Sequence, residues 1–219
     1  MNIKPILFNT EMVKAVLDGI KHCTRRVVKG YIPKDAKFGY TAFTPKGCIS
    51  CRGIFEDGYG EKFFKMPYQK GDILYVRETW FKGLKRYMYR ADYTDSEKYY
   101  QNGEEVNMKW KPSIHMPKKA ARIWLKVTDV RVERLQDITE EQACMEGTDP
   151  WDEACYENNG WHPTLSDPDS GGDPNMIDGF HKLWNSTIKK TDLDRYGWDA
   201  NPFVWVIEFE RCEEPEGDE

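Results

Sequence analysis

Residues 203–209 read FVWVIEF, which is the clearest strand signal in the chain. Large apolar side chains stand at every second position, as in a β-strand with a buried face. A second alternating stretch covers residues 123–127 and resumes at 130–132. The interruption at Thr128 and Asp129 indicates a bulge or a turn within a long strand pair.

The rest of the chain offers more short strands than helices. Residues 3–8 and 73–76 read as strands. We expect helices to begin at Asn9 or the residue after it, at the capping box that Thr139 opens, and at Asp173. No regular alternation of strands and helices calls for a parallel sheet. The pattern therefore predicts an α+β protein, a small mixed β-barrel with peripheral helices.

One domain accounts for the length of the chain. A protein of 219 residues can bury about 70% of the surface of its unfolded form, enough for one core without disulfides or metal. We expect a single domain over residues 1–212, with insertions near 30–66 and 148–175. Residues 213–219 form an acidic tail that we expect to be disordered.

The formal net charge of -5 is unevenly distributed. Five acidic residues lie within 213–219, so the body up to Cys212 is neutral. Basic runs at residues 21–37 and 118–122 stand in that body. Such runs can recognise a phosphate locally, but they lack the broad field that drives non-specific binding to duplexes. A solvated face without a partner is the alternative.

The absence of long apolar stretches bears on the compartment of the protein, and the compartment bears on its cysteines. No 18 apolar residues run together, and residues 1–12 lack the apolar core of a signal peptide, so we expect a cytoplasmic protein with no membrane partner. Disulfides are rare in that compartment. Among the six cysteines only Cys48 and Cys51 have the spacing of a metal site. Without a second pair, we expect structural cysteines, no metal and no cofactor.

A polar motif follows the first helix. Residues 19–26 read GIKHCTRR and fit the pattern G-x-K-x-x-T-x-R. The pattern gathers a small residue, an ammonium, a hydroxyl and a guanidinium at Gly19, Lys21, Thr24 and Arg26. The pair Arg77 and Glu78 directly follows the strand at 73–76, where charges must be solvated, ion-paired or functional. We expect the side chains of Lys21, Thr24, Arg26 and Glu78 to share one solvent-reachable cleft. An internal salt bridge is the alternative role of Arg77 and Glu78.

Further motifs accompany this one: GDIL at 71–74, RETW at 77–80, WKPSIHMP at 110–117 and WDANP at 198–202. Together they resemble the ASCH-domain proteins, a PUA-like family, in the form found in bacteriophages and prophages. The resemblance covers nearly the whole chain and is weakest at 30–66 and 148–175. It implies a PUA-like β-barrel with a cleft that is lined by the G-x-K-x-x-T-x-R motif and binds RNA or nucleotides.

The threonine of the motif adds a possible activity. Many ASCH proteins carry glutamate at the position of Thr24, whereas the threonine version is similar to a small bacterial branch that hydrolyses the acetyl amide of N-acetylated cytidine. The resemblance implies catalytic roles for Lys21, Thr24 and Glu146, the last in the later short helix. A partly desolvated lysine can activate a hydroxyl, and Glu146 or Glu78 could orient water or protonate a leaving amine. The alternative is an ion pair between Lys21 and Glu146 beside an ordinary strand threonine.

Trp80 and His115 complete the candidate binding residues. Trp80 could stack on a base and His115 could line the cleft, although core packing and structural hydrogen bonding are the usual roles of such residues. Three functions are therefore compared: a module that binds nucleic acid or nucleotides, a hydrolase acting on a nucleoside amide or RNA, and a phage accessory protein whose residues 148–175 contact a protein partner.

Overall fold

The computed structural model describes residues 2–84, 86–94, 99–101, 104–106, 108–148 and 176–215. The chain forms two compact units, each assembled from segments that are distant in the sequence. Unit 1 comprises Met1–Lys21, Gly71–Val127 and Phe209–Glu219, and unit 2 comprises His22–Lys70 and Thr128–Glu208. Except for residue 148, the predicted insertion at 148–175 lies outside the described residues, as do residues 216–219 of the tail.

The sheet of unit 1 has β6 (Ile73–Arg77) at its centre. This strand pairs in parallel with β1 (Ile3–Leu7) and antiparallel with the first part of β11 (Trp124–Arg134). Leu74 and Val76 are completely buried, which explains why an apolar run occupies the central strand. The remaining strands and 3-10 turns of the unit are β7 (Trp80–Lys82), β8 (Tyr87–Tyr89), β9 (Tyr99–Gln101), β10 (Glu104–Val106), η1 (Arg90–Asp92), η2 (Ser113–His115) and η3 (Lys118–Ala120).

Helix α1 (Thr10–Leu17) leads from β1 to the polar motif. Asn9 caps it as predicted, because its side-chain oxygen accepts a hydrogen bond of 2.8 Å from the backbone N–H of Met12. After the helix, Gly19 has φ +73°, a left-handed conformation that glycine adopts without strain. The helix therefore ends at Leu17, and the chain turns directly into Lys21.

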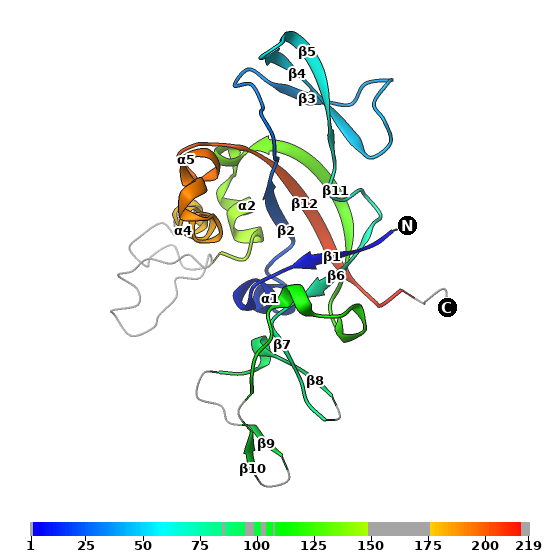
Figure 1. The fold of residues 1–219 in the computed structure, drawn as a ribbon, viewed down its shortest axis with the longest axis vertical. Helices are drawn as coiled ribbons and strands as arrows, with labels where there is room; N and C mark the ends of the chain where they lie inside the picture. Colours follow the sequence, from blue (N-terminus) through cyan, green and yellow to red (C-terminus); the bar gives the residue numbers. More distant parts are fainter. Residues whose placement is uncertain are drawn as a thin grey trace. The chain divides into compact units, whose positions relative to one another are not determined.

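Unit 2 contains the other end of the same five-stranded sheet, whose order is β1-β6-β11-β12-β2 (Figure 1). Here β12 (Phe203–Cys212) pairs antiparallel with β2 (Cys23–Val27). Both strands predicted from alternation are confirmed. Of the two alternatives predicted at Thr128 and Asp129, a bulge or a turn, the turn is wrong, because β11 continues through both residues as one strand.

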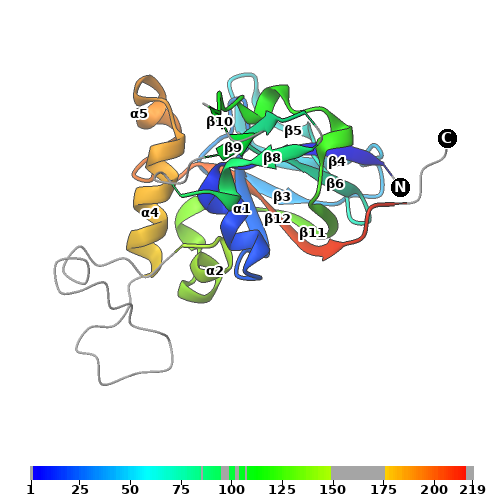
Figure 2. The same cartoon turned by 90° about the horizontal axis from the view of Figure 1, so that it is seen from below.

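Helices of unit 2 pack together beside this end of the sheet. Figure 2 shows α2 (Glu140–Met145) beside α4 (Met176–Thr187). The predicted capping box of α2 is present, since Thr139 and Gln142 exchange hydrogen bonds between side chain and backbone. Helix α5 (Leu193–Tyr196) and the 3-10 turns η4 (Leu135–Asp137) and η5 (Lys190–Asp192) complete the unit. The apolar core between sheet and helices includes Leu135, Ile138, Ala143, Met176, Phe180, Trp184, Val204 and Val206.

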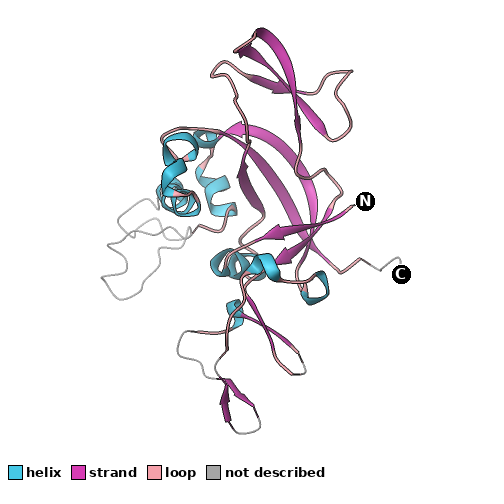
Figure 3. Ribbon diagram, in the orientation of Figure 1, coloured by secondary structure: helices cyan, strands magenta, loops and turns pink. Residues whose placement is uncertain are grey.

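A separate antiparallel sheet fills the first predicted insertion. Figure 3 shows its three strands, β3 (Lys37–Gly39), β4 (Cys48–Phe55) and β5 (Gly58–Lys65). Cys48 and Cys51 lie three residues apart on β4, so their side chains point to opposite faces and cannot bind one metal ion together. Burial, reinforced by Asp35, raises the pKa of the Cys51 thiol to about 11, which suits a structural cysteine.

The predicted α+β class is confirmed by this mixed sheet, the smaller sheets and the few helices. Within the part of the chain that the structure describes, the strands form no closed barrel, since β1 and β2 end the five-stranded order. Among the same residues, no helix combines the length and the apolar character needed to cross a membrane.

Candidate functional site

Strand β2 distributes the motif over two faces of the sheet. Successive side chains of a strand alternate, so Thr24 and Arg26 share one face and Arg25 lies on the other. On the first face they stand opposite Ile207 and Trp205 of β12. Arg25 therefore has a different environment from the two residues that the motif pattern emphasises.

Arg25 is buried and anchored to helix α2. Its Nη2 donates to Gln142 Oε1 at 2.8 Å, and its Nη1 donates to Glu146 Oε1 at 3.1 Å. Glu133 Oε2 lies 3.7 Å from Nη2, and the guanidinium carbon lies 5.7 Å from the ring centroid of Phe180. Glu146, the predicted catalytic glutamate, is thus part of a buried ion pair and is only 3% exposed. Residue patterns alone predicted no site role for Arg25, although two adjacent arginines on a short strand must face opposite sides.

Thr24 is the least satisfied polar residue of this strand. Its side chain is buried, and its Oγ1 has no hydrogen-bond partner among the described residues. A buried hydroxyl without a partner costs roughly 1–3 kcal/mol. In the same part of the chain, Arg25 Nε and Glu133 Oε2 also lack hydrogen bonds. The polar groups around β2 are therefore incompletely satisfied, which is the condition of a site that can accept a further molecule.

Arg26 keeps part of its surface in solvent. The protein packed around its guanidinium nevertheless lowers the pKa of the group, and the charges of Glu146 and Tyr68 oppose that effect. Its Nη1 donates to the backbone oxygen of Arg25 at 3.2 Å. Arginine retains its charge under such conditions, so Arg26 presents a cation at a partly exposed position.

The other motif residues belong to unit 1. Lys21 is 2% exposed, and its Nζ lies 5.6 Å from the ring centroid of Phe8. Gly19 is exposed at the end of α1. The expectation of solvent-reachable side chains is not met by Lys21, Thr24 or Glu78, all of which are buried. Their convergence on one cleft remains a prediction.

Glu78 belongs to a closed network in unit 1. Arg122 binds both of its carboxylate oxygens, through Nε at 2.9 Å and Nη2 at 3.0 Å. The third nitrogen, Nη1, donates to both oxygens of Asp92 at 2.8 Å, and the guanidinium carbon lies 4.0 Å from the ring centroid of Tyr89. Burial raises the pKa of Glu78, while its hydrogen bond and charge interaction with Arg122 oppose the rise and Asp92 adds to it. Glu78 is therefore held in a buried salt bridge, with Arg122 rather than Arg77 as its partner.

The remaining predicted residues of unit 1 have structural contacts. Arg77 Nη2 donates to the backbone oxygen of Ile114. Trp80 is buried with Met116 and Ala120, so its ring belongs to a small core. His115 is exposed at the end of η2. Of the predicted aromatic and imidazole groups, only the imidazole of His115 is therefore open to solvent.

No protein-family model, curated protein or solved structure matches the chain. The residues that bear on function are therefore the polar side chains around β2 and the network of Glu78 and Arg122.

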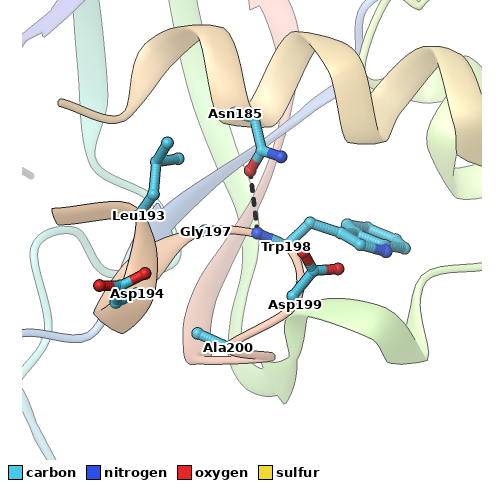
Figure 4. Close-up of a pocket in the computed structure, with 7 residues that line it drawn as sticks. All are labelled: Asn185, Leu193, Asp194, Gly197, Trp198, Asp199 and Ala200. Carbon is cyan, nitrogen blue, oxygen red and sulfur yellow. Dashed lines mark hydrogen bonds between the residues drawn. The ribbon is translucent and has the colours of Figure 1, made fainter. Parts of the chain in front are cut away.

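The WDANP motif at 198–202 has a visible structural role. Figure 4 shows a pocket with a volume of about 320 Å³ beside the motif, where Asn185 Oδ1 accepts a hydrogen bond of 2.9 Å from the backbone N–H of Trp198. Asn201 has φ 44°, and its Oδ1 accepts a hydrogen bond from the backbone N–H of Gln136. The pocket is lined by Asn185, Leu193, Asp194, Gly197, Trp198, Asp199 and Ala200. The motif thus forms a tight turn, and the pocket contains none of the predicted site residues.

Proposed function

We propose that the chain binds a nucleotide or nucleic acid through Arg26 and Thr24 on their shared face of β2. The observation that carries this proposal is the buried Thr24 hydroxyl, which has no partner among the described residues. A ligand that supplies the missing hydrogen bond would recover the cost of burying that group. Arg26 lies two residues away on the same face, which provides a cation for a phosphate.

The chemistry of Arg26 favours a phosphate over a small neutral ligand. A guanidinium presents forked N–H donors that match the oxygens of a phosphate. Arg26 is partly exposed, whereas Thr24 is buried. A ligand would therefore contact Arg26 first, and it would reach Thr24 only after the residues that cover Thr24 have moved. The similarity of the motif to ASCH proteins supports a nucleotide as the phosphate donor. The PUA-like barrel that the same similarity implies is part of this proposal.

Titration with cytidine monophosphate, cytidine and a short oligoribonucleotide at low salt tests this function. We expect the phosphate-bearing ligands to bind. Arg26→Gln should weaken their binding roughly tenfold. It should also lower the slope of log affinity against log salt by the amount expected for loss of about one phosphate contact. Thr24→Val should weaken binding without destabilising the fold, since no hydrogen bond of the described protein is lost.

Lys29→Gln is the matched control, because it removes a charge from an exposed position of the same unit. Equal affinities for the Arg26→Gln variant, the Lys29→Gln variant and the unaltered protein would refute the assignment of phosphate binding to Arg26.

Hydrolysis of an acetylated cytosine nucleoside is the second candidate function. It is favoured by the same observation, because a hydroxyl that donates to no described group is available as a nucleophile. In this reaction the Thr24 oxygen takes the acetyl group as the amide C–N bond breaks, and the amine leaves with the hydroxyl proton. Water then hydrolyses the acetyl ester to acetate and restores the hydroxyl. Glu146 accepts a hydrogen bond from Arg25, so we assign it an orienting role rather than that of proton donor.

Release of acetate from N-acetylcytidine measures this activity directly. Lys21→Ala, Thr24→Val and Glu146→Gln should each reduce turnover by roughly a hundredfold or more if the three residues form the catalytic group. The glutamine variant keeps an oxygen for Arg25 and so separates catalysis from folding. A protein that binds cytidine monophosphate but releases no acetate is a binding module and not this hydrolase.

A further inference from the structure

The sheet of β3, β4 and β5 has one buried and one exposed face. Phe38, Cys51 and Phe55 lie on the inner face, where Phe38 packs edge-on against Phe64 with ring centroids 5.7 Å apart. The register places Tyr59 opposite Ile54. Tyr59 and Phe63 share the outer face of β5, because they are an even number of residues apart. We call the exposed side chains of Lys37, Arg52, Ile54, Tyr59, Glu61, Phe63 and Lys65 the outer face.

Aromatic and aliphatic exposure on the outer face is unusually high. Tyr59 is 78% exposed, Ile54 61% and Phe63 43%. The two rings lie four residues apart along one strand, a separation of roughly 13 Å at the usual strand rise. Apolar side chains scattered singly over a surface are common, whereas large ones grouped in this way mark a binding site.

Positive charge accompanies these rings. Residues 29–70 contain eight Lys or Arg and four Asp or Glu, a formal net charge of +4 in a chain whose total is -5. Lys37, Arg52 and Lys65 belong to the outer face itself. The carboxylate on this face, Glu61, is neutralised by Arg52 at 3.0 Å. The remaining two lysines give the face a positive charge beside its aromatic rings.

We propose that the outer face of the β3–β4–β5 sheet binds single-stranded nucleic acid. Exposed aromatic rings provide stacking platforms for unpaired bases, and neighbouring lysines and arginines bind the backbone that connects them. The distance between Tyr59 and Phe63 suits two separate bases rather than one base held between two rings. This surface lies in the same unit as Arg26 but uses none of the residues of the β2 site.

A protein partner is the less suitable occupant. The centres of protein interfaces are depleted of lysine, whereas here Lys65 lies two residues from Phe63 on the same face of β5. The outer face also carries a net positive charge in a chain whose total is negative, which provides complementarity to a polyanion.

Fluorescence anisotropy with labelled twelve-nucleotide oligo(U) and oligo(dT) tests the proposal. Tyr59→Ala and Phe63→Ala should each weaken binding of at least one of them by roughly 5- to 150-fold, the range for loss of one base–aromatic stack. Lys37→Gln and Lys65→Gln should each lower the slope of log affinity against log salt by about 0.7. Tyr100→Ala is the matched control, since this tyrosine is 58% exposed and belongs to unit 1.

Cytidine monophosphate distinguishes this surface from the β2 site. We expect Tyr59→Ala and Phe63→Ala to leave the affinity for the mononucleotide unchanged, whereas Arg26→Gln lowers it. Unchanged oligonucleotide affinity in a Tyr59→Ala, Phe63→Ala double variant overturns the proposal, whether or not the mononucleotide binds. Capture of a protein by the outer face, without oligonucleotide binding, overturns it as well.

Discussion

Two arginine clusters can be compared, one in each compact unit. In unit 1, all three nitrogens of the Arg122 guanidinium donate to carboxylate oxygens of Glu78 and Asp92. In unit 2, Arg25 is buried more deeply, yet its Nε lacks a hydrogen-bond partner among the described residues. Each nitrogen of the first guanidinium has a hydrogen-bond partner, whereas one nitrogen of the second has none among the described residues.

The difference separates a structural role from a candidate site. Because each nitrogen of the Arg122 guanidinium already donates to a carboxylate, Arg122 and Glu78 serve to hold β6 and the segments around it. Unsatisfied atoms around β2, above all the hydroxyl of Thr24, leave capacity for one. From the sequence, Glu78 and Thr24 were both expected to line one cleft, and only their hydrogen bonds distinguish them.

Removal of Arg25 should have the largest effect on stability. Arg25→Ala leaves Glu146 buried without its 3.1 Å partner, and such losses typically cost about 3–5 kcal/mol. Unfolding in urea, followed by tryptophan fluorescence, measures the change. Arg52→Ala is the control, because its pair with Glu61 is exposed and should matter by less than about 1 kcal/mol. Equal decreases in the free energy of unfolding for both variants would show that the buried contacts of Arg25 stabilise the fold no more than an exposed ion pair does.

Removal of Arg122 should cost less, roughly 2–3 kcal/mol at neutral pH. Its side chain is 26% exposed, and Glu78, whose pKa burial already raises, can take up a proton when its partner is lost. The loss for Arg122→Ala should therefore shrink in acid, as measured by urea unfolding at pH 5 and pH 7. Lys126→Ala, from an exposed pair with Glu210, provides the control. A loss that grows on acidification contradicts this account.

Glu78 itself should give the protein a pH-dependent stability. Its pKa in the folded protein lies above its usual value of 4.5, mainly because of burial, with Arg122, Asp92 and Tyr89 as the neighbouring groups. Between 4.5 and the raised value the folded state binds the proton more strongly, so stability falls as pH rises through this window.

Glu78→Gln should remove that slope, which is at most about 1.4 kcal/mol per pH unit. Melting temperatures at intervals from pH 4 to pH 7 measure it. Glu11→Gln, at an exposed position of α1, should retain the slope of the unaltered protein. Parallel profiles for the Glu78→Gln variant and the unaltered protein would disprove the assignment.

The smallest effect concerns two hydroxyl groups. Tyr89 donates to the backbone oxygen of Ala120 at 2.7 Å, whereas Thr24 donates to no described group. Tyr89→Phe should therefore cost about 1 kcal/mol, while Thr24→Val should be neutral or stabilising. Thermal unfolding of both variants compares them directly. Strong destabilisation by Thr24→Val would mean that its hydroxyl supports the fold, and the β2 site would lose its main support.

Local signals in the sequence determined the elements of the fold. Alternation predicted β12 and β11, and the cap at Asn9 and the box opened by Thr139 predicted where α1 and α2 begin. These signals depend on residues within one turn of helix or along one strand. They are therefore readable without knowledge of the partners of each element.

Tertiary structure alone decided the roles of the polar residues. The sequence grouped Glu78 with Arg77, but the partner that neutralises Glu78 is Arg122, 44 residues away. It also gave Arg25 no role, although Arg25 joins β2 to Glu146, 121 residues further along the chain. Charge pairing depends on distances between segments that only the folded chain brings together. Local patterns of residue type therefore do not predict which charged residues pair.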